Sequence, residues 1–184
     1  MATKHLTMAE LEAGLDHIRQ SPQDDGVLEM IVRRPSTDER ELLEVGELDT
    51  AVGLVGDNWQ TRGSKSTPDG SANPNAQLTL MNSRAADLVA QSRDRWALAG
   101  DQLYIDFDLS EENIPPGTQL QIGDAIVEVT AQPHTGCKKF VTRYGMDAVK
   151  FVNSPTGKQL HLRGINTKVI QSGTIHAGAS ITKM

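Results

Sequence analysis

Residues 119–130 read QLQIGDAIVEVT, a run in which apolar and polar side chains alternate on either side of Gly123-Asp124. Alternation with a period of two is typical of a strand that has one buried face. A two-residue turn of Gly and Asp between two such strands indicates a β-hairpin. This segment therefore predicts that the chain folds mainly as β-structure.

The remainder of the chain extends this interpretation. Further extended segments are expected over residues 27–33, 40–47, 49–55, 77–81, 103–107, 165–170 and 179–182, although 40–47 could also be helical. Short amphipathic helices are expected from a capping box at Thr7 to about Ser21, and over 83–92 and 146–153. The sum predicts a mainly β, strand-rich α+β domain of barrel type.

Residues 56–76 form a long stretch rich in Gly, Ser, Pro and Asn that also contains Trp59, Arg62 and Lys65. Loops of this length in compact domains are usually functional or disordered. A tryptophan and two cations favour a functional loop, with a mobile insertion as the alternative.

Cys137 is the only cysteine of the chain, and its surroundings read PHTGCKKF over residues 133–140. A single thiol forms neither an intramolecular disulfide nor a multi-cysteine zinc site, so it is either an inert side chain or a reactive one. Lys138, Lys139 and Arg143 supply positive charge that favours the thiolate, the nucleophilic and metal-binding form. The sequence therefore favours a functional Cys137.

The charges along the chain are distributed unevenly. Residues 132–184 carry eight Lys and Arg against one acid, Asp147, whereas residues 1–131 carry 10 basic and 23 acidic side chains. A basic segment around the lone cysteine of an acidic chain predicts an anionic small-molecule ligand, although each lysine could simply be a solvated surface residue. The acidic total, −6, and the lack of aromatic residues among the basic ones argue against nucleic acid as the main partner.

No run of 18 apolar residues is present, which excludes a membrane-spanning helix. The N-terminal residues contain no apolar signal core, and a single cysteine is compatible with a reducing compartment. We expect a cytoplasmic protein.

Several motifs, taken in order, resemble those of the MOSC domain family, the module found at the C-terminus of molybdenum cofactor sulfurases. They are GD at 123–124, PHTGC at 133–137, FVN at 151–153, LRGIN at 162–166 and SGTIHAG at 172–178. The resemblance covers about residues 45–184, so the chain is interpreted as a single domain, 1–184, with an N-terminal helix and strand extension over 1–45. It implies a closed, mainly antiparallel β-barrel with a few flanking short helices.

The resemblance also implies a function. In this family the single cysteine either ligates the molybdenum of a pyranopterin cofactor or carries a persulfide sulfur, and that role falls on Cys137, with His134 as a possible base or hydrogen-bond partner. The cofactor phosphate would be bound by cations, for which the candidates are Lys138, Lys139, Arg143, Arg163, Arg84 and Arg62. Without a flavin, haem or iron–sulfur motif, electrons or sulfur would come from a separate reductase or sulfur donor.

Three functions remain open at this stage: a molybdenum-dependent reductase of N-hydroxylated small molecules, a persulfide carrier or cofactor-delivery module, and a barrel retained only for binding. Two other sites are less favoured. His134, Cys137, His161 and His176 could be a zinc set, but their spacing matches no compact zinc motif. A cysteine hydrolase would use Cys137, His134 and an acid such as Asp147.

Overall fold

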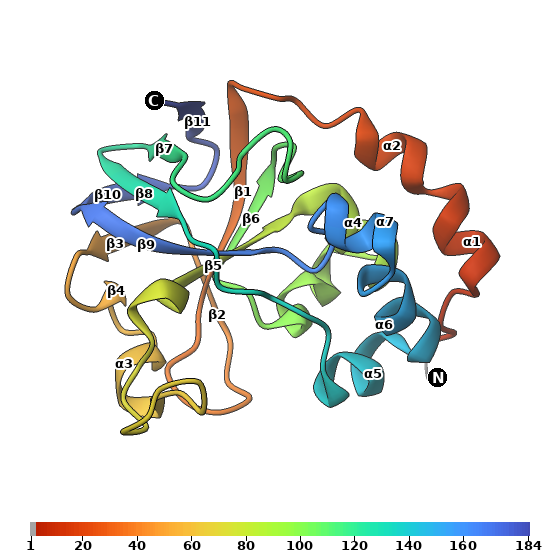
Figure 1. Ribbon diagram of the computed structural model, residues 1–184, viewed down its shortest axis with the longest axis horizontal. Coiled ribbons are helices and arrows are strands. Elements are labelled where there is room, and N and C mark those ends of the chain that lie inside the picture. Colours follow the sequence, from red (N-terminus) through yellow and green to blue (C-terminus); the bar gives the residue numbers. More distant parts are fainter. Residues whose placement is uncertain (1–2) are drawn as a thin grey trace.

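The computed structural model describes residues 3–184 and has a closed seven-stranded barrel at its centre (Figure 1). The strands follow one another around it in the order β11–β7–β8–β9–β5–β6–β1, and the pairing of β1 with β11 closes it. Their bounds are β1 Gly26–Arg33, β5 Leu78–Asn82, β6 Leu103–Asp106, β7 Gln119–Ile122, β8 Ala125–Val129, β9 Ile165–Gln171 and β11 Ser180–Lys183. Neighbours are antiparallel except β5 and β6, which run parallel. The predicted strand-rich barrel is confirmed.

The hairpin predicted for residues 119–130 is present as β7 and β8. Ile122 pairs with Ala125, and the alternate residues Leu120, Val127 and Val129 lie in the barrel core. Gly123 has φ +56 at the turn, and a Cβ there would lie 2.6 Å from the Thr174 carbonyl oxygen, so a residue with a side chain would be strained. The period-two pattern therefore specified both the hairpin and its buried face.

A second, three-stranded sheet lies beside the barrel and was predicted only in part. It contains β10 (Gly173–His176), β3 (Val45–Asp49) and β4 (Gly53–Leu54), while β2 (Glu41–Leu43) pairs with the end of β1. Residues 172–173 were expected to belong to a connection, yet Gly173 begins β10 and pairs with Leu48. Burial of Ile175 in the core explains this strand, which is too short for its alternation to be recognised.

Except for α3 (Trp59–Arg62), the helices lie on one side of the barrel, where they contribute to a second hydrophobic cluster (Figure 1). They are α1 (Met8–Ala13), α2 (Leu15–Arg19), α4 (Ser83–Ala90), α5 (Lys138–Tyr144), α6 (Met146–Val152) and α7 (Pro155–Gln159), with a 3₁₀ segment, η2 (Arg93–Ala99). The expected single N-terminal helix is divided at Gly14, which ends α1 and precedes α2. None of these helices within residues 3–184 is both long and apolar enough to cross a membrane.

Helices α5 and α7 were not predicted. In α5, Phe140 and Tyr144 are buried and stack edge-to-face within the helix, with their ring centroids 4.8 Å apart. Both also make tertiary contacts: the Tyr144 hydroxyl donates to the Arg95 carbonyl (2.7 Å), and the Arg163 guanidinium lies over the Phe140 ring. Packing of this kind outweighs the modest helix propensity of a segment rich in aromatic and β-branched residues. Helix α5 matters for function because it begins directly after Cys137.

The 56–76 segment contains a short helix, α3 (Trp59–Arg62), and a 3₁₀ turn, η1 (Pro74–Ala76). Trp59 is buried, and the Asn73 side-chain amide donates hydrogen bonds to Ser66 Oγ (3.0 Å) and Gln132 Oε1 (3.1 Å). The segment is thereby attached to residue 132, at the start of the coil that leads to Cys137.

Candidate functional site

Cys137 occupies the N-cap of α5, at the end of the coil that leaves β8. Its side chain is exposed. Partial burial raises the pKa of the thiol, but the backbone N–H groups of Phe140 and Lys139 and the charges of Arg163 and Arg143 act against it, so the net pKa is lowered. The local geometry thus favours the thiolate, as the charged neighbours had predicted.

Asn153, at the end of α6, fixes the backbone before the cysteine. Its Oδ1 accepts a hydrogen bond from the Gly136 N–H (3.0 Å), and its Nδ2 donates to the Gly136 carbonyl (3.4 Å). A Cβ on Gly136 would lie only 3.2 Å from Val152, so the close approach of the coil to α6 favours glycine. Asn166, on β9, holds the preceding residues by donating to the carbonyls of Gln132 and Pro133.

Cys137 opens into a cavity of about 490 Å³ whose wall is strongly cationic. Most of these cations come from parts of the chain that are distant in sequence: the end of β1 and the loop after it, the 56–76 segment, α5 and the turn before β9. They are Arg34, Arg40, Arg62, Lys65, Lys139, Arg143 and Arg163, and Asp38 is the single acid that residues 3–184 contribute to the lining. The fold therefore gathers around this one cavity cations from before residue 132 as well as those of the basic C-terminal segment that the sequence had indicated.

Several of the arginines are held in place by the protein. Arg34 forms a two-point ion pair with the buried carboxylate of Asp57, and Arg40 Nε donates to the Ala97 carbonyl (3.0 Å). Burial, followed by the charge of neighbouring arginines, lowers the pKa of Arg40 and of Arg62. Cations that disfavour one another in this way would be stabilised by a bound anion.

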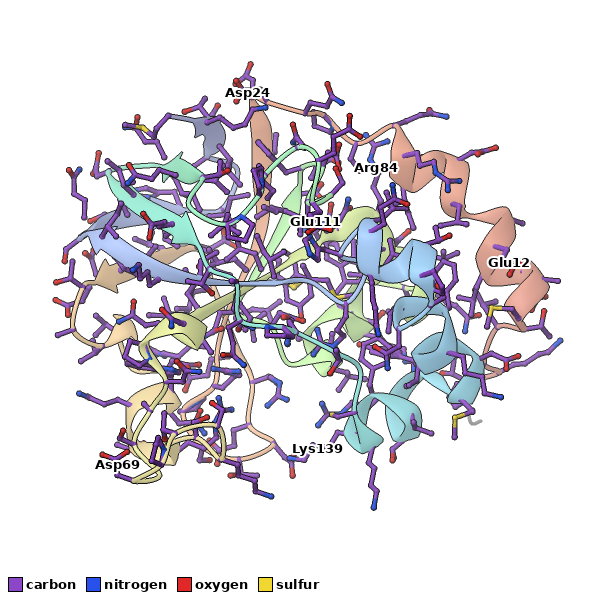
Figure 2. The ribbon with its side chains drawn as sticks, in the orientation of Figure 1. Glu12, Asp24, Asp69, Arg84, Glu111 and Lys139 are labelled. Atoms are coloured by element: carbon purple, nitrogen blue, oxygen red, sulfur yellow. The ribbon has the colours of Figure 1, made fainter. Side chains whose placement is uncertain are left out.

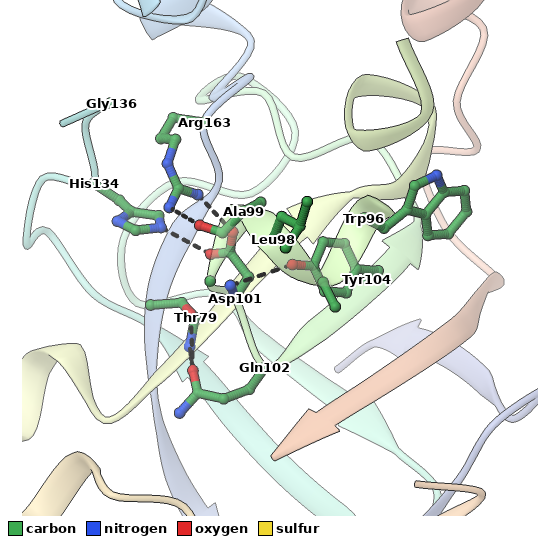
Figure 3. Close-up of polar contacts among 12 residues, drawn as sticks. Thr79, Trp96, Leu98, Ala99, Asp101, Gln102, Tyr104, His134, Gly136 and Arg163 are labelled. Carbon is green, nitrogen blue, oxygen red and sulfur yellow. Dashed lines mark hydrogen bonds and ion pairs between the residues drawn. The ribbon is translucent and has the colours of Figure 1, made fainter. Parts of the chain in front are cut away.

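A buried carboxylate, Asp101, organises the floor of the site (Figure 3). Its Oδ2 accepts a hydrogen bond from Arg163 Nη1 (2.5 Å), and its Oδ1 lies 2.8 Å from His134 Nε2. Arg163 also donates to the Ala99 carbonyl (2.8 Å), and its guanidinium lies over the Phe140 ring, 5.0 Å from the centroid. Although burial alone would raise the pKa of Asp101, the charge of Arg163 and the hydrogen bonds from His134 and Arg163 lower it to about 2.

This arrangement fixes the protonation state of His134. Burial and the Arg163 charge lower the pKa of the imidazole, so it is neutral at physiological pH. Because the ionised Asp101 can only accept, Nε2 carries the proton and Nδ1 is left as the basic atom. The Cδ2 atom of the His134 ring faces Gly164, and a Cβ added at Gly164 would lie 3.1 Å from it.

The structure brings most of the predicted site residues together. Cys137, His134, Lys139, Arg143, Arg163 and Arg62 all line the cavity. Lys138 is exposed and is not part of the wall. Arg84 lies away from the site, where it forms an ion pair with Asp106 (2.9 Å) and donates a hydrogen bond to the His17 carbonyl in α2. Figure 2 shows Arg84 far from Lys139, which extends from α5. The expectation that Arg84 would bind the cofactor phosphate at the pocket is therefore wrong.

Three residues of the site were missed from the sequence: Asp101, Arg34 and Arg40. Asn153 belongs to the FVN motif at 151–153, but no role was predicted for it. The one available signal for Asp101 was an acid inside the largely apolar run WALAGDQLYI over residues 96–105, which had to be buried with a partner or to end a strand. No local pattern marks Arg34 or Arg40, because their contribution depends on how the loop after β1 folds back over the barrel.

The less favoured sites are not assembled. Within residues 3–184, no group of three or more His, Cys, Asp or Glu side chains is placed to hold a metal ion, so the proposed zinc set does not form. Asp147 accepts a hydrogen bond from the Met8 N–H (3.1 Å), and the acid that binds His134 is Asp101. The triad expected for a cysteine hydrolase is therefore absent in the form predicted.

Comparisons with known proteins agree with the architecture. A sequence profile of the MOSC domain matches residues 68–182. The fold is similar to the crystal structure of the YUAD protein from Bacillus subtilis, with a TM-score of 0.64 and 12% identity over 86% of this chain and 94% of that one. It is also similar to YiiM from Escherichia coli (TM-score 0.55, 19% identity, 86% and 69% coverage) and from Geobacillus stearothermophilus (0.53, 14%, 89% and 74%). No match was found among curated protein sequences.

Proposed function

The chain belongs to the MOSC domain family, and we propose that it binds a molybdenum cofactor at Cys137 and uses it to reduce small N-hydroxylated molecules. The family is associated with binding of the molybdenum cofactor. The observation that carries the proposal is the position of one thiol with a lowered pKa at the wall of a cavity with seven cations. Neither feature alone would select this cofactor, but together they match a ligand that is both anionic and in need of a soft donor.

The residues present fit such a cofactor. Among residues 3–184 no group of three or more His, Cys, Asp or Glu side chains is placed to hold a metal ion, and Cys137 offers one thiolate, which suits a metal that is already bound by organic ligands. A thiolate is a suitable donor for that purpose. When bound, the cofactor would supply two-electron redox chemistry at its metal.

The cations would bind the anionic part of the cofactor. Arg62 and Lys65 come from the 56–76 segment, and Arg40 comes from the loop after β1, so the wall is built partly from segments that fold back onto the barrel. Arginine suits phosphate because its planar guanidinium donates two parallel hydrogen bonds. Lys139 and Arg143 share Asp38 as an ion-pair partner, each at 3.2 Å, and that exposed acid would compete with the ligand for them.

His134 would handle a proton. Asp101 holds Nε2–H, and the basic Nδ1 can accept a proton from water or substrate and return it. Reduction of an N-hydroxylated molecule breaks its N–O bond, consumes two electrons and two protons, and releases water. We propose that a separate reductase supplies the electrons.

A second candidate is favoured by the exposure of Cys137. A thiolate open to solvent can attack the outer sulfur of a donor persulfide, forming a persulfide on Cys137 while the donor leaves as a thiol. In that case the protein would carry sulfur without any redox turnover of its own.

One experiment separates the two candidates. The protein is purified from cells with active cofactor synthesis and is assayed with benzamidoxime and a chemically reduced viologen as the electron donor, beside Cys137→Ser and Arg84→Gln. Turnover by the wild type and by Arg84→Gln, lost in Cys137→Ser, supports the reductase. A reductant-sensitive one-sulfur mass adduct on Cys137, without turnover, would instead favour the carrier.

A further inference from the structure

A second cavity, of about 440 Å³, adjoins the one at Cys137 and has no part in the proposed chemistry. The two cavities share the segment from Gln132 to His134, together with Arg163 and Asn166. The rest of its wall comes from the end of β8, from α6 and α7, and from the turn before β9. It is thus a separate space behind the coil that leads to the cysteine.

The charge of this second cavity differs sharply from that of the first. Its charged residues are Glu111 and Lys158, both exposed at the rim, and Arg163, whose guanidinium is already paired with Asp101. Glu111 lies beside α7, where its backbone N–H donates to the Gln159 carbonyl (Figure 2). One acid balances one base, so the cavity offers no net charge to select an ion.

Two polar groups in the wall have unused hydrogen-bonding capacity. His161 Nδ1 lies 2.7 Å from the Leu109 carbonyl, which can only accept, so Nδ1 donates and Nε2 is the ring nitrogen left to accept a hydrogen bond from a ligand. His161 has φ +50, a conformation that is uncommon for a residue other than glycine. Arg163 is only 7% exposed, and its Nε has no hydrogen-bond partner within residues 3–184. A buried donor without a partner is costly, and a ligand carbonyl would satisfy it.

The remaining wall is largely apolar. Val129, Pro133, Val152 and Ile165 contribute hydrophobic surface, with Pro116 at the edge. Such a surface favours a flat, uncharged ligand over a highly hydrated one.

From these features we propose that the second cavity is a binding site for a small neutral molecule that carries an amide-type edge, a carbonyl beside an N–H, on an apolar ring. The N–H would donate to His161 Nε2, and the carbonyl would accept from Arg163 Nε once the Arg163 side chain shifts enough to expose that atom, which is fully buried without a ligand. The inference goes beyond the cofactor proposal and does not require it, because the site is complete without any group at Cys137.

Binding of a ligand in the second cavity would affect the position of Cys137. Asn153 lines the second cavity and holds both backbone groups of Gly136, and His134 belongs to both walls. A ligand that contacts these residues therefore contacts the segment that positions the thiol.

The test uses nicotinamide as the neutral probe and nicotinate as its anionic counterpart, titrated into ¹⁵N-labelled, cofactor-free full-length protein. Nicotinamide is expected to give saturable NMR shifts of the amides of residues 157–164 and of Gly136, with nicotinate binding more weakly. His161→Asn, which tolerates a left-handed backbone, should weaken nicotinamide binding about five-fold, the effect of one lost hydrogen bond. His176→Asn, an exposed histidine on β10, is the matched control and should leave binding unchanged.

A second variant keeps the test decisive if His161→Asn unfolds. Ala131 is exposed at the cavity wall, so Ala131→Trp should fill the space and abolish the shifts while the remaining spectrum is preserved. The proposal is overturned by a lack of saturable shifts at residues 157–164, by nicotinate binding at least as tightly as nicotinamide, or by unchanged binding in a folded Ala131→Trp variant. None of these results depends on whether molybdenum cofactor binds at Cys137.

Discussion

Arg163 and Asp101 form an ion pair from which water is largely excluded: the Nη1 and Oδ2 atoms lie 2.5 Å apart, and the side chains are 8% and 0% exposed. A buried pair of this kind need not stabilise the fold relative to an apolar pair, but loss of one partner leaves an uncompensated charge. It also connects the turn before β9 to the end of η2, the two segments between which His134 is held. The floor of the site and the stability of the fold therefore depend on the same contact.

Replacement of Asp101 by Asn should be strongly destabilising. The variant leaves the Arg163 guanidinium buried without its counter-ion, and the expected loss in the free energy of unfolding is about 3–5 kcal/mol. Asp106→Asn, which breaks the partly exposed pair with Arg84, should cost about 1 kcal/mol or less. Urea denaturation measures both, and equal losses in the two variants would contradict the role given to the buried pair.

The stabilising effect of Asp101 should depend on pH in a defined direction. Its pKa in the folded protein, about 2, is below the ordinary value of 3.8, so its contribution is fully present above pH 3.8 and decreases as the pH falls towards 2. The difference in unfolding free energy between the wild type and Asp101→Asn should therefore narrow over that range. A difference that stays constant down to pH 2 would show that the carboxylate is not stabilised by its charge.

Cys137 should react as a thiolate at lower pH than an unperturbed cysteine. The rate of alkylation by iodoacetamide reports the thiolate fraction, and its pH midpoint should lie below the ordinary thiol value because of the two α5 backbone N–H groups and the charges of Arg163 and Arg143. Arg143→Gln should move the midpoint upward, while Arg84→Gln, far from the cavity, should not. A midpoint at or above that of free cysteine would contradict the electrostatic account of the site.

The cations of the 56–76 segment should bind anions even without a cofactor. Pyrophosphate is expected to bind in the cavity, and Arg62→Gln should weaken it about ten-fold, the effect of one lost charge-assisted hydrogen bond. Lys168→Gln is the control, because Lys168 pairs with Glu128 and is not part of this wall. Calorimetry at low ionic strength measures both, and equal affinities for the two variants would remove Arg62 from the anion site.

The sequence predicted those parts of the molecule that depend on local pattern. Alternation around Gly123-Asp124 predicted the hairpin of the barrel, and the cations adjacent to Cys137 predicted its lowered pKa. The features that the sequence did not predict depend on tertiary contacts. Helix α5 is fixed by burial of Phe140 and Tyr144, and Asp101 acquires its role because residue 163 folds against it. Arg84 was misplaced for the same reason, since its partner Asp106 lies 22 residues away on β6.

Cys137 is proposed to be the protein's ligand to the molybdenum cofactor. The molybdenum content of protein purified from cells with active cofactor synthesis tests this role, measured for the wild type and for Cys137→Ser, with circular dichroism confirming that both are folded. Near-stoichiometric molybdenum in the wild type and its loss in Cys137→Ser is the predicted result. A folded wild type without molybdenum, or a Cys137→Ser variant that retains it fully, would contradict the account.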